Sequence, residues 1–354
     1  MDGDHAELLN RSAMVLKGLT CAPTGAVVAA ATTSLPEVPG GEANWDYRYS
    51  WVRDSSVALV SLAQVGHPEV AQGFRDFVMR SSAGSGNELQ IMYGPYGERS
   101  LPERELDLEG WRGSAPVRVG NAAATQTQLD VYGHLLETAH LWHTRGGTID
   151  NDEWTFLSSV VNQAAARRGE PDSGMWEMRG PQRHHVHSKV MIWLALDRGI
   201  SLVETHGFDD GTSEGWREKR DEVRHEIETR GVDPDHGNFV QYYGTTAVDA
   251  SLLRLPLVGF VDANDERMRT TTDAIMNQLG VAPHGFLRRY QRDPDSDEDE
   301  GVFLLCSFWL VEVLALQGRI KEANDLFLAL TDVGNDLGLF SEEYDVANRE
   351  LLGN

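Results

Sequence analysis

The amino-acid sequence predicts an all-α fold, and three observations lead to this class. Apolar residues recur with the 3.6-residue period of an amphipathic helix along the whole chain. Alternating patterns typical of strands are few and short. Segments rich in Gly, Pro and Asp separate the periodic runs. The eleven predicted helices cover residues 5–18, 53–65, 67–82, 125–143, 151–168, 184–205, 213–230, 248–260, 264–279, 301–317 and 319–334.

Several of the predicted helices have residues at their boundaries that favour a helix start or a helix end. Three starts are favoured by capping or first-turn residues: Pro68-Glu69, Asp150 or Asn151, and Thr212-Ser213. Glycine ends four predicted helices, at positions 66, 207, 280 and 318. Because so many amphipathic helices must share a core, we expect hairpins arranged in concentric rings.

The composition indicates an acidic protein. The 354 residues include 55 Asp and Glu against 31 Lys and Arg, which gives a net charge of -24. Such a surface repels phosphate backbones, so the sequence argues against a nucleic-acid partner. The only four lysines are Lys17, Lys189, Lys219 and Lys321. Excess acid with few lysines fits a protein kept soluble at high salt, but a GC-rich genome would also favour arginine.

No sequence feature indicates secretion or a membrane. Cys21 and Cys306 lie far apart and belong to no metal-ligand motif, so a reducing compartment is expected. The first twenty residues carry acids where a secretion signal has cations and an apolar run. The apolar stretch from Val302 to Leu316 is interrupted and shorter than the about 18 residues that indicate a membrane span. We therefore expect a soluble, cytoplasmic protein.

The chain is predicted to be one domain, residues 1–354, because no long linker interrupts the helices. Its only biased segment is the acidic run from Asp293 to Glu300. This run resembles a calcium loop, but Glu300 stands where an EF-hand needs its sixth-position glycine. A solvated acidic loop is the expected structure.

Four loops between helices carry unusual residues. The first, Asn44 to Asp54, places four aromatic residues and two arginines around two acids. Aromatic faces bind sugar rings, and Arg and Asp side chains bind hydroxyl groups through directional hydrogen bonds. A core cluster with one buried ion pair explains this loop equally well. The second loop, residues 101–121, has a similar mixture.

The other two loops carry candidate catalytic carboxylates. Glu177 lies between Trp176 and Met178, and Glu342 and Glu343 follow Ser341 in the last loop. A carboxyl group among apolar neighbours can keep its proton near neutrality and act as a general acid. Two separated carboxylates with aromatic and Arg partners suit glycoside hydrolysis. Ordinary surface loops remain the alternative for this pair and for the second loop.

Other chemistries lack their sequence motifs. There is no GxxxxGK phosphate loop, GxGxxG, HExxH or GxSxG. His184, His185 and His187 could ligate a metal, but their place at a helix start favours capping and packing. No metal site is therefore predicted.

Seven motifs carry a family resemblance. They are NWDYRYSWVRD, LQIMYGPYGERSLPERELDLEGWRGSAPVRVGNAA, GMWEMRG, HSKVMIWLALDRGI, DASLLRLPLVGF, GVFLLCSFWLVEVLAL and NDLGLFSEEYD. In this order they resemble the glucoamylase-type glycoside hydrolases of family fifteen, in their bacterial and archaeal branch. The resemblance covers nearly the whole chain. It implies an (α/α)6 barrel, inverting hydrolysis of α-glucosidic bonds from a non-reducing end, and no cofactor.

The resemblance also implies roles for single residues. Glu177 matches the family's general acid and Glu342 its general base, with Glu343 as the neighbour that helps to place the water. The residues implied to bind the sugar are Tyr47, Trp51, Arg53, Asp54, Trp176 and Arg289.

Two departures from the family pattern affect the expected domain. The first helix begins within ten residues of Met1, so the amino-terminal β-sandwich domain of many relatives is expected to be absent. The sequence stops at Asn354, where the family continues into a last barrel helix. The chain is therefore expected to be a barrel with a truncated carboxyl-terminal end.

Three functions agree with these features. The first is an inverting, exo-acting α-glucosidase that releases β-glucose from maltooligosaccharides, starch or dextran. The second is a trehalase of the same family, and the third is a sugar-binding module without catalysis. The expected partner is an oligosaccharide or disaccharide, and the sequence leaves the oligomeric state open.

Overall fold

The structure is a computed structural model that describes residues 5–67, 69–178, 180–207, 213–291 and 300–354. The helix starts predicted at Pro68 and Thr212, and the acidic run from Asp293 to Asp299, lie outside the described residues.

The described residues form eleven α-helices, which confirms the all-α prediction. Asp150 caps α5 by accepting a 2.8 Å hydrogen bond from the Glu153 amide, and Gly207 ends α6 at a φ of 73°. The helices are α1 (Ala6–Gly18), α2 (Val52–Gln64), α3 (Glu69–Ser81), α4 (Asp130–Thr144), α5 (Asn151–Arg167), α6 (Val186–His206), α7 (Ser213–Arg230), α8 (Arg254–Leu257), α9 (Glu266–Leu279), α10 (Leu304–Leu316) and α11 (Ile320–Thr331).

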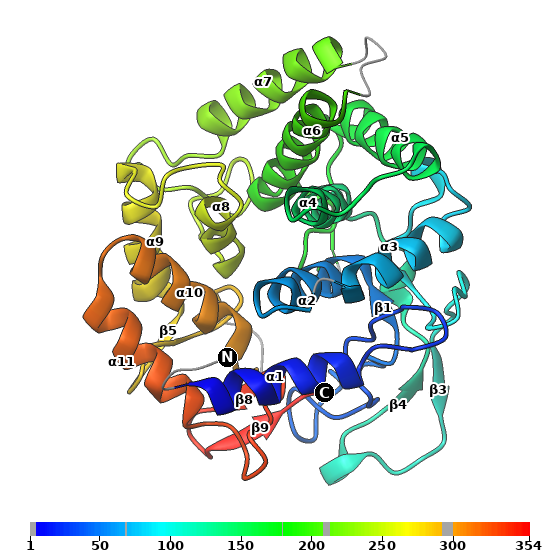
Figure 1. Cartoon of the computed structure of the whole chain (residues 1–354). Coiled ribbons are helices and arrows are strands. Elements are labelled where there is room, and N and C mark those ends of the chain that lie inside the picture. Colours follow the sequence, from blue (N-terminus) through cyan, green and yellow to red (C-terminus); the bar gives the residue numbers. More distant parts are fainter. Residues whose placement is uncertain (1–4, 68, 179, 208–212, 292–299) are drawn as a thin grey trace.

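The helices are arranged as a ring of hairpins (Figure 1). The even-numbered helices α2, α4, α6, α8 and α10 surround the centre, and odd-numbered helices lie outside them. Burial agrees with this order, because α4 and α10 are buried on most faces whereas α1 has no buried residue. One hydrophobic cluster runs through the ring from Ala26 to Tyr344.

One predicted helix, residues 248–260, is much shorter than expected. Residues Ala250–Leu253 form a 3-10 turn, and α8 follows with a single turn. Asp249 precedes the turn but does not cap it, because its carboxylate accepts hydrogen bonds from Ser251 Oγ at 2.6 Å and Trp176 Nε1 at 2.7 Å. Pro256, which lacks an amide hydrogen, lies within α8.

The strands between and after these helices are short and pair antiparallel. The pairs are β1 (Ser50–Trp51) with β2 (Met92–Tyr93), β3 (Arg104–Leu106) with β4 (Val117–Val119), and β5 (Gly280–Val281) with β6 (Phe286–Leu287). A three-stranded sheet joins β7 (Val302–Phe303), β8 (Glu343–Asp345) and β9 (Glu350–Leu352). In it Phe303 pairs with Glu343, which fixes the last carboxylate pair beside α10.

The three histidines near the start of α6 pack against rings. His184 stacks on Tyr243 with ring centroids 5.8 Å apart, and His185 contacts Tyr242 edge to face. His185 occupies the N-cap position of α6 but makes no side-chain capping bond. Packing therefore accounts for these side chains, as expected, and capping by His185 is not found. Within the part of the chain described, no helix is long and apolar enough to cross a membrane.

Candidate active site

The predicted site residues come from four chain segments, which contacts between their side chains bring together. Trp51 lies in β1, and the next turn of chain, the start of α2, carries Arg53. Glu177 lies in the loop before α6. Arg289 follows β6, and Glu342 directly precedes β8. The short strands thus deliver side chains that are far apart in sequence to one place.

Glu177 is held by two donors from the first loop. Its Oε1 atom accepts a 2.7 Å hydrogen bond from Trp51 Nε1 and lies 3.4 Å from Arg53 Nη2. The side chain is 24% exposed, so a ligand can reach it. Its backbone has a φ of 56°, a conformation that costs a residue with a Cβ about 1 kcal/mol or more. Gln126 Nε2 holds this backbone by donating to the Glu177 carbonyl at 3.1 Å.

Arg53 is fixed by partners on several sides. Its Nη1 donates to Gln128 Oε1 at 2.9 Å and lies 3.9 Å from Asp130, and its Nε lies 3.2 Å from Asp54. These acids, together with Glu177, hold the pKa of the guanidinium above its ordinary value despite burial. Asp54, whose side chain is 44% exposed, presents its carboxylate to solvent next to this fixed cation.

Aromatic rings form the sides of the site. The rings of Tyr47 and Trp51 meet edge to face with centroids 5.7 Å apart, and both pack on a small buried cluster with Met92 and Leu101. Trp176 contacts Phe303 at 5.8 Å. Burial raises the pKa of the Asp249 carboxyl, which accepts the Trp176 hydrogen bond, to about 6.

Glu342 is the least satisfied of the predicted carboxylates. Its Oε2 atom is buried without a hydrogen-bond partner among the described residues. Burial, followed by the negative charge of Glu37, raises the pKa of this carboxyl to about 8, while Arg289 and the Tyr47 hydroxyl oppose the shift. A carboxylate with a free oxygen and a raised pKa is a strong base for an incoming water.

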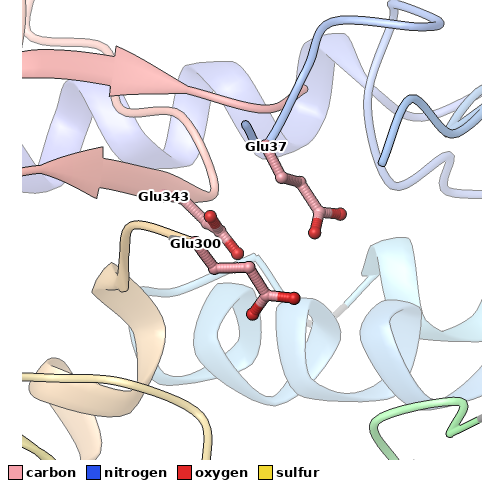
Figure 2. Close-up of side chains that lie close together, drawn as sticks. All are labelled: Glu37, Glu300 and Glu343. Carbon is pink, nitrogen blue, oxygen red and sulfur yellow. The ribbon is translucent and has the colours of Figure 1, made fainter. Parts of the chain in front are cut away.

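Glu37, Glu300 and Glu343 lie close together (Figure 2), and all three pair with Arg289. Its Nη2 atom lies 3.0 Å from Glu37, 2.9 Å from Glu300 and 3.3 Å from Glu343. Oxygens of the three glutamates lie within 4.8 Å of one another, a spacing that could also hold a metal ion. The guanidinium already supplies a cation to all three carboxylates, so their proximity is explained without a metal. Glu343 is completely buried and also accepts from the Gly301 amide at 3.1 Å.

The family model for glycosyl hydrolases family 15 matches residues 3–354. The chain belongs to this family. The chain is 40% identical over 352 residues to a protein named trehalase from Thermoplasma acidophilum, which covers 99% of this chain and 60% of that protein. It is 43% identical over 353 residues to a trehalase from Mycolicibacterium smegmatis, which covers 98% of this chain and 52% of that protein. The chain therefore spans only about half to three fifths of the length of these family 15 relatives.

Solved structures share the fold. A wild-type glycosidase superposes with a TM-score of 0.77 at 20% identity, covering 99% of this chain and 90% of that one. A bacterial glucoamylase complexed with acarbose gives a TM-score of 0.72 at 16% identity, covering 95% of this chain and 51% of that one. The (α/α)6-barrel prediction is confirmed, and so is the predicted membership of glycoside hydrolase family 15.

The structure assembles the predicted family 15 residues into two groups. One group consists of Trp51, Arg53, Asp54 and Glu177, and the other of Tyr47, Arg289, Glu342 and Glu343. The edge-to-face contact of Tyr47 with Trp51 joins the groups. The Trp176 indole donates to Asp249, and its ring contacts Phe303.

Several residues of the site were not predicted from the sequence. Glu37 stands in a loop that carries no motif, and only its burial in the fold, at 2% exposure, distinguishes it. Glu300 was expected in a solvated acidic loop; that expectation is wrong for this residue, because its carboxylate pairs with Arg289 and is 29% exposed. Gln128 and Asp130 lie in a segment predicted as helix from residue 125, but α4 begins at Asp130. A 3-10 helix covers Ala122–Thr125, and Gln126 after it has an extended backbone; Gln126 contacts Glu177 and Gln128 contacts Arg53.

One part of the second loop, residues 101–121, is an ordinary surface loop, and another part packs against the first loop. Trp111 is 47% exposed and stacks on Arg112, as an ordinary surface loop would place it. Arg118 is 6% exposed, lies over the ring of Trp45 and donates to the Glu42 carbonyl at 2.7 Å. This arginine therefore contacts the first loop through Trp45.

Proposed function

We propose that the chain is the catalytic barrel of an inverting trehalase, which hydrolyses the α,α-1,1 bond of trehalose. The observation that carries this proposal is the 40% identity to a trehalase across 99% of the chain. The sequence alone favoured a glucan α-glucosidase, with trehalase as the alternative. The identity to trehalases favours trehalase. The carboxylate pair suits either substrate, because both contain a terminal α-linked glucose.

In this reaction Glu177 acts as the general acid. The oxygen of water attacks the anomeric carbon, the bond to the leaving glucose breaks, and the departing oxygen takes the proton of Glu177. Trp51 and Arg53, both donors to Oε1, hold the carboxyl in place and stabilise the negative charge that remains on it.

Glu342 acts as the general base. It removes a proton from the attacking water, and its unpartnered oxygen is available for that water. Exchange with solvent then returns a proton to Glu177 and removes one from Glu342. The net reaction consumes one water and yields two glucose molecules.

Binding of the sugar falls to the residues between these carboxylates. Arg53 and Asp54 form a fixed ion pair of which Asp54 is exposed, so hydroxyl groups of the terminal glucose can bond to both charges. Tyr47 and Trp51 supply the aromatic wall against which the apolar face of the ring packs. Both carboxylates flank this wall, because Glu177 binds Trp51 and Glu342 faces Tyr47.

A panel of substrates tests the proposal. Purified protein should cleave trehalose with a kcat/KM at least about tenfold above that for maltose, maltotriose and isomaltose, a preference of about 1.4 kcal/mol in transition-state binding. Preference for maltotriose would establish a glucan α-glucosidase instead. Binding of these sugars without any hydrolysis would establish the sugar-binding module.

A further inference from the structure

Glu37, a residue outside every motif of the sequence, lies beside the proposed general base. Gly353, which follows β9, lies next to both glutamates: a Cβ atom at this position would lie 3.7 Å from Glu342 Oε2 and 3.8 Å from Glu37 Cγ. The Gly353 amide donates to the Pro36 carbonyl at 2.9 Å, and the Glu37 amide to the Ala43 carbonyl at 3.0 Å. The backbone therefore fixes where Glu37 lies.

The Glu37 carboxylate binds two groups that also face Glu342. Its Oε2 accepts a 3.0 Å hydrogen bond from Arg289 Nη2, and its Oε1 accepts a 3.4 Å hydrogen bond from the Tyr47 hydroxyl. Arg289 and Tyr47 are the two groups that favour the ionised form of Glu342. The buried carboxylate of Glu37 thus holds both Arg289 and Tyr47 in place.

The charges around this pair are mostly negative. Glu342 is faced by Glu37, Asp54, Arg289 and Tyr47, with Glu343 as its chain neighbour, and Glu37 is faced by Arg289, Tyr47 and Glu300. A single guanidinium therefore serves several carboxylates. Burial and this like charge raise the pKa of Glu37 as well as that of Glu342.

We propose that Glu37 is a positioning residue for the general base: it holds Arg289 and Tyr47 against Glu342 and places a second carboxylate beside it. This role rests on the proposed function of Glu342. Glu37 itself touches neither the water nor the sugar in this scheme. Its effect is to make Glu342 a stronger base, since a carboxylate near another negative charge holds a proton more tightly.

The test variant is Glu37→Gln, which removes the charge but keeps an oxygen that can accept from Tyr47. The acid limb of kcat/KM should move to lower pH by about one unit, and kcat on the plateau should fall several-fold because the base is weaker. KM should change less than kcat. Glu300→Gln is the matched control: Glu300 also binds Arg289 through one oxygen, but its tyrosine partner is Tyr290 rather than Tyr47. Its acid limb should move by less than half of the shift in Glu37→Gln.

A second measurement follows the protonation of Glu342 directly and does not depend on catalysis. In protein with ¹³C-labelled glutamate carboxyls, the resonance that disappears in Glu342→Gln belongs to Glu342, and its titration midpoint should fall by about one pH unit in Glu37→Gln. Failure of the whole substrate panel would refute the proposed function but leave this titration intact. An unchanged midpoint, in a Glu37→Gln protein with the wild-type melting temperature, would overturn the role of Glu37. If that variant is destabilised, Glu37→Asp, which retains the charge, should keep the wild-type midpoint; a midpoint lowered as in Glu37→Gln would overturn the role too.

Discussion

The indole nitrogen of Trp51 donates a 2.7 Å hydrogen bond to Oε1 of Glu177, across 126 residues of sequence. The same oxygen lies 3.4 Å from Arg53, so the proposed acid is oriented by a neutral donor and a cation from one loop. Sequence reasoning assigned Trp51 to the wall of the sugar pocket. The structure adds a second task to that expectation, because the Trp51 indole also orients the carboxyl of Glu177.

Trp51→Phe should separate these two tasks. The variant keeps an aromatic wall but loses the donor to Glu177, so kcat should fall about tenfold while KM changes little. Steady-state kinetics on the best substrate of the panel measures both. Trp216→Phe is the matched control, since it loses a 2.9 Å indole bond to Asn162 between α5 and α7. Its activity should stay at the wild-type level, and a comparable loss there would show that the effect is not specific to the site.

The acid and the base should respond differently to amide substitution. Glu177→Gln removes the proton donor, so hydrolysis of the natural disaccharide should fall by 10²- to 10⁴-fold, in order of magnitude, while α-glucosyl fluoride, whose leaving group needs no proton, should keep much more activity. Glu342→Gln should impair both substrates alike. Normal cleavage of the disaccharide by Glu177→Gln would show that another residue is the acid.

The stereochemistry of the product tests the two roles together. Attack by water from the side opposite the leaving group gives β-glucose, and the leaving half of trehalose departs as α-glucose. Proton NMR of the anomeric signals, recorded before mutarotation, should therefore show equal amounts of both anomers. The α-anomer alone would indicate a retaining reaction and contradict the assignment of Glu342 as a base for water.

Activity and stability should depend on pH in opposite directions between about pH 6.5 and 8. The pKa of Glu342 is raised to about 8, and its ionised form is the base, so kcat/KM should rise through this window. The raised pKa of Glu342 means that the folded state binds more protons than the unfolded chain, so stability should fall as pH rises through this window. Rate profiles and melting temperatures measured in the same buffers check both slopes. A parallel rise of both would exclude a raised pKa of Glu342.

The acidic composition predicts a response to salt. With a net charge of -24, self-repulsion should weaken as the screening length falls from about 10 Å at 0.1 M to about 3 Å at 1 M. The melting temperature should rise from low to molar KCl. A flat or falling midpoint would favour codon composition as the cause of the scarcity of lysine.

Local pattern was sufficient to predict most helices. Their amphipathic period and their glycine ends depend on residues a few positions apart, and helix boundaries such as Asp150 and Gly207 are found where expected. The helix over 248–260 failed because Asp249 bonds to Trp176, a residue 73 positions away. The prediction of helix at Val302 and Phe303 failed for a similar reason, because these residues form a strand with distant partners, Tyr344 and Glu343.

The site was predictable where its residues occur in motifs, and not elsewhere. Glu177 and Glu342 stand in runs with unusual neighbours, which allowed both to be singled out. Glu37 has no such signal, because what distinguishes it is burial against Arg289 and Tyr47, contacts that only the folded chain creates. The prediction for Glu300 was wrong because its acidic neighbours in the sequence indicated a solvent-exposed loop. In the structure its carboxylate pairs with Arg289.

The carboxylates around Arg289 should also affect which molecules bind at the proposed site. Glu37, Glu300, Glu342 and Glu343 place more acidic groups beside this guanidinium than its single charge can balance. A phosphorylated or carboxylated sugar would meet repulsion here, on a protein whose net charge is already -24, whereas a neutral sugar offers hydroxyl groups that can donate hydrogen bonds to these oxygens. Electrostatics would then disfavour charged sugars, even those whose rings match the site in shape.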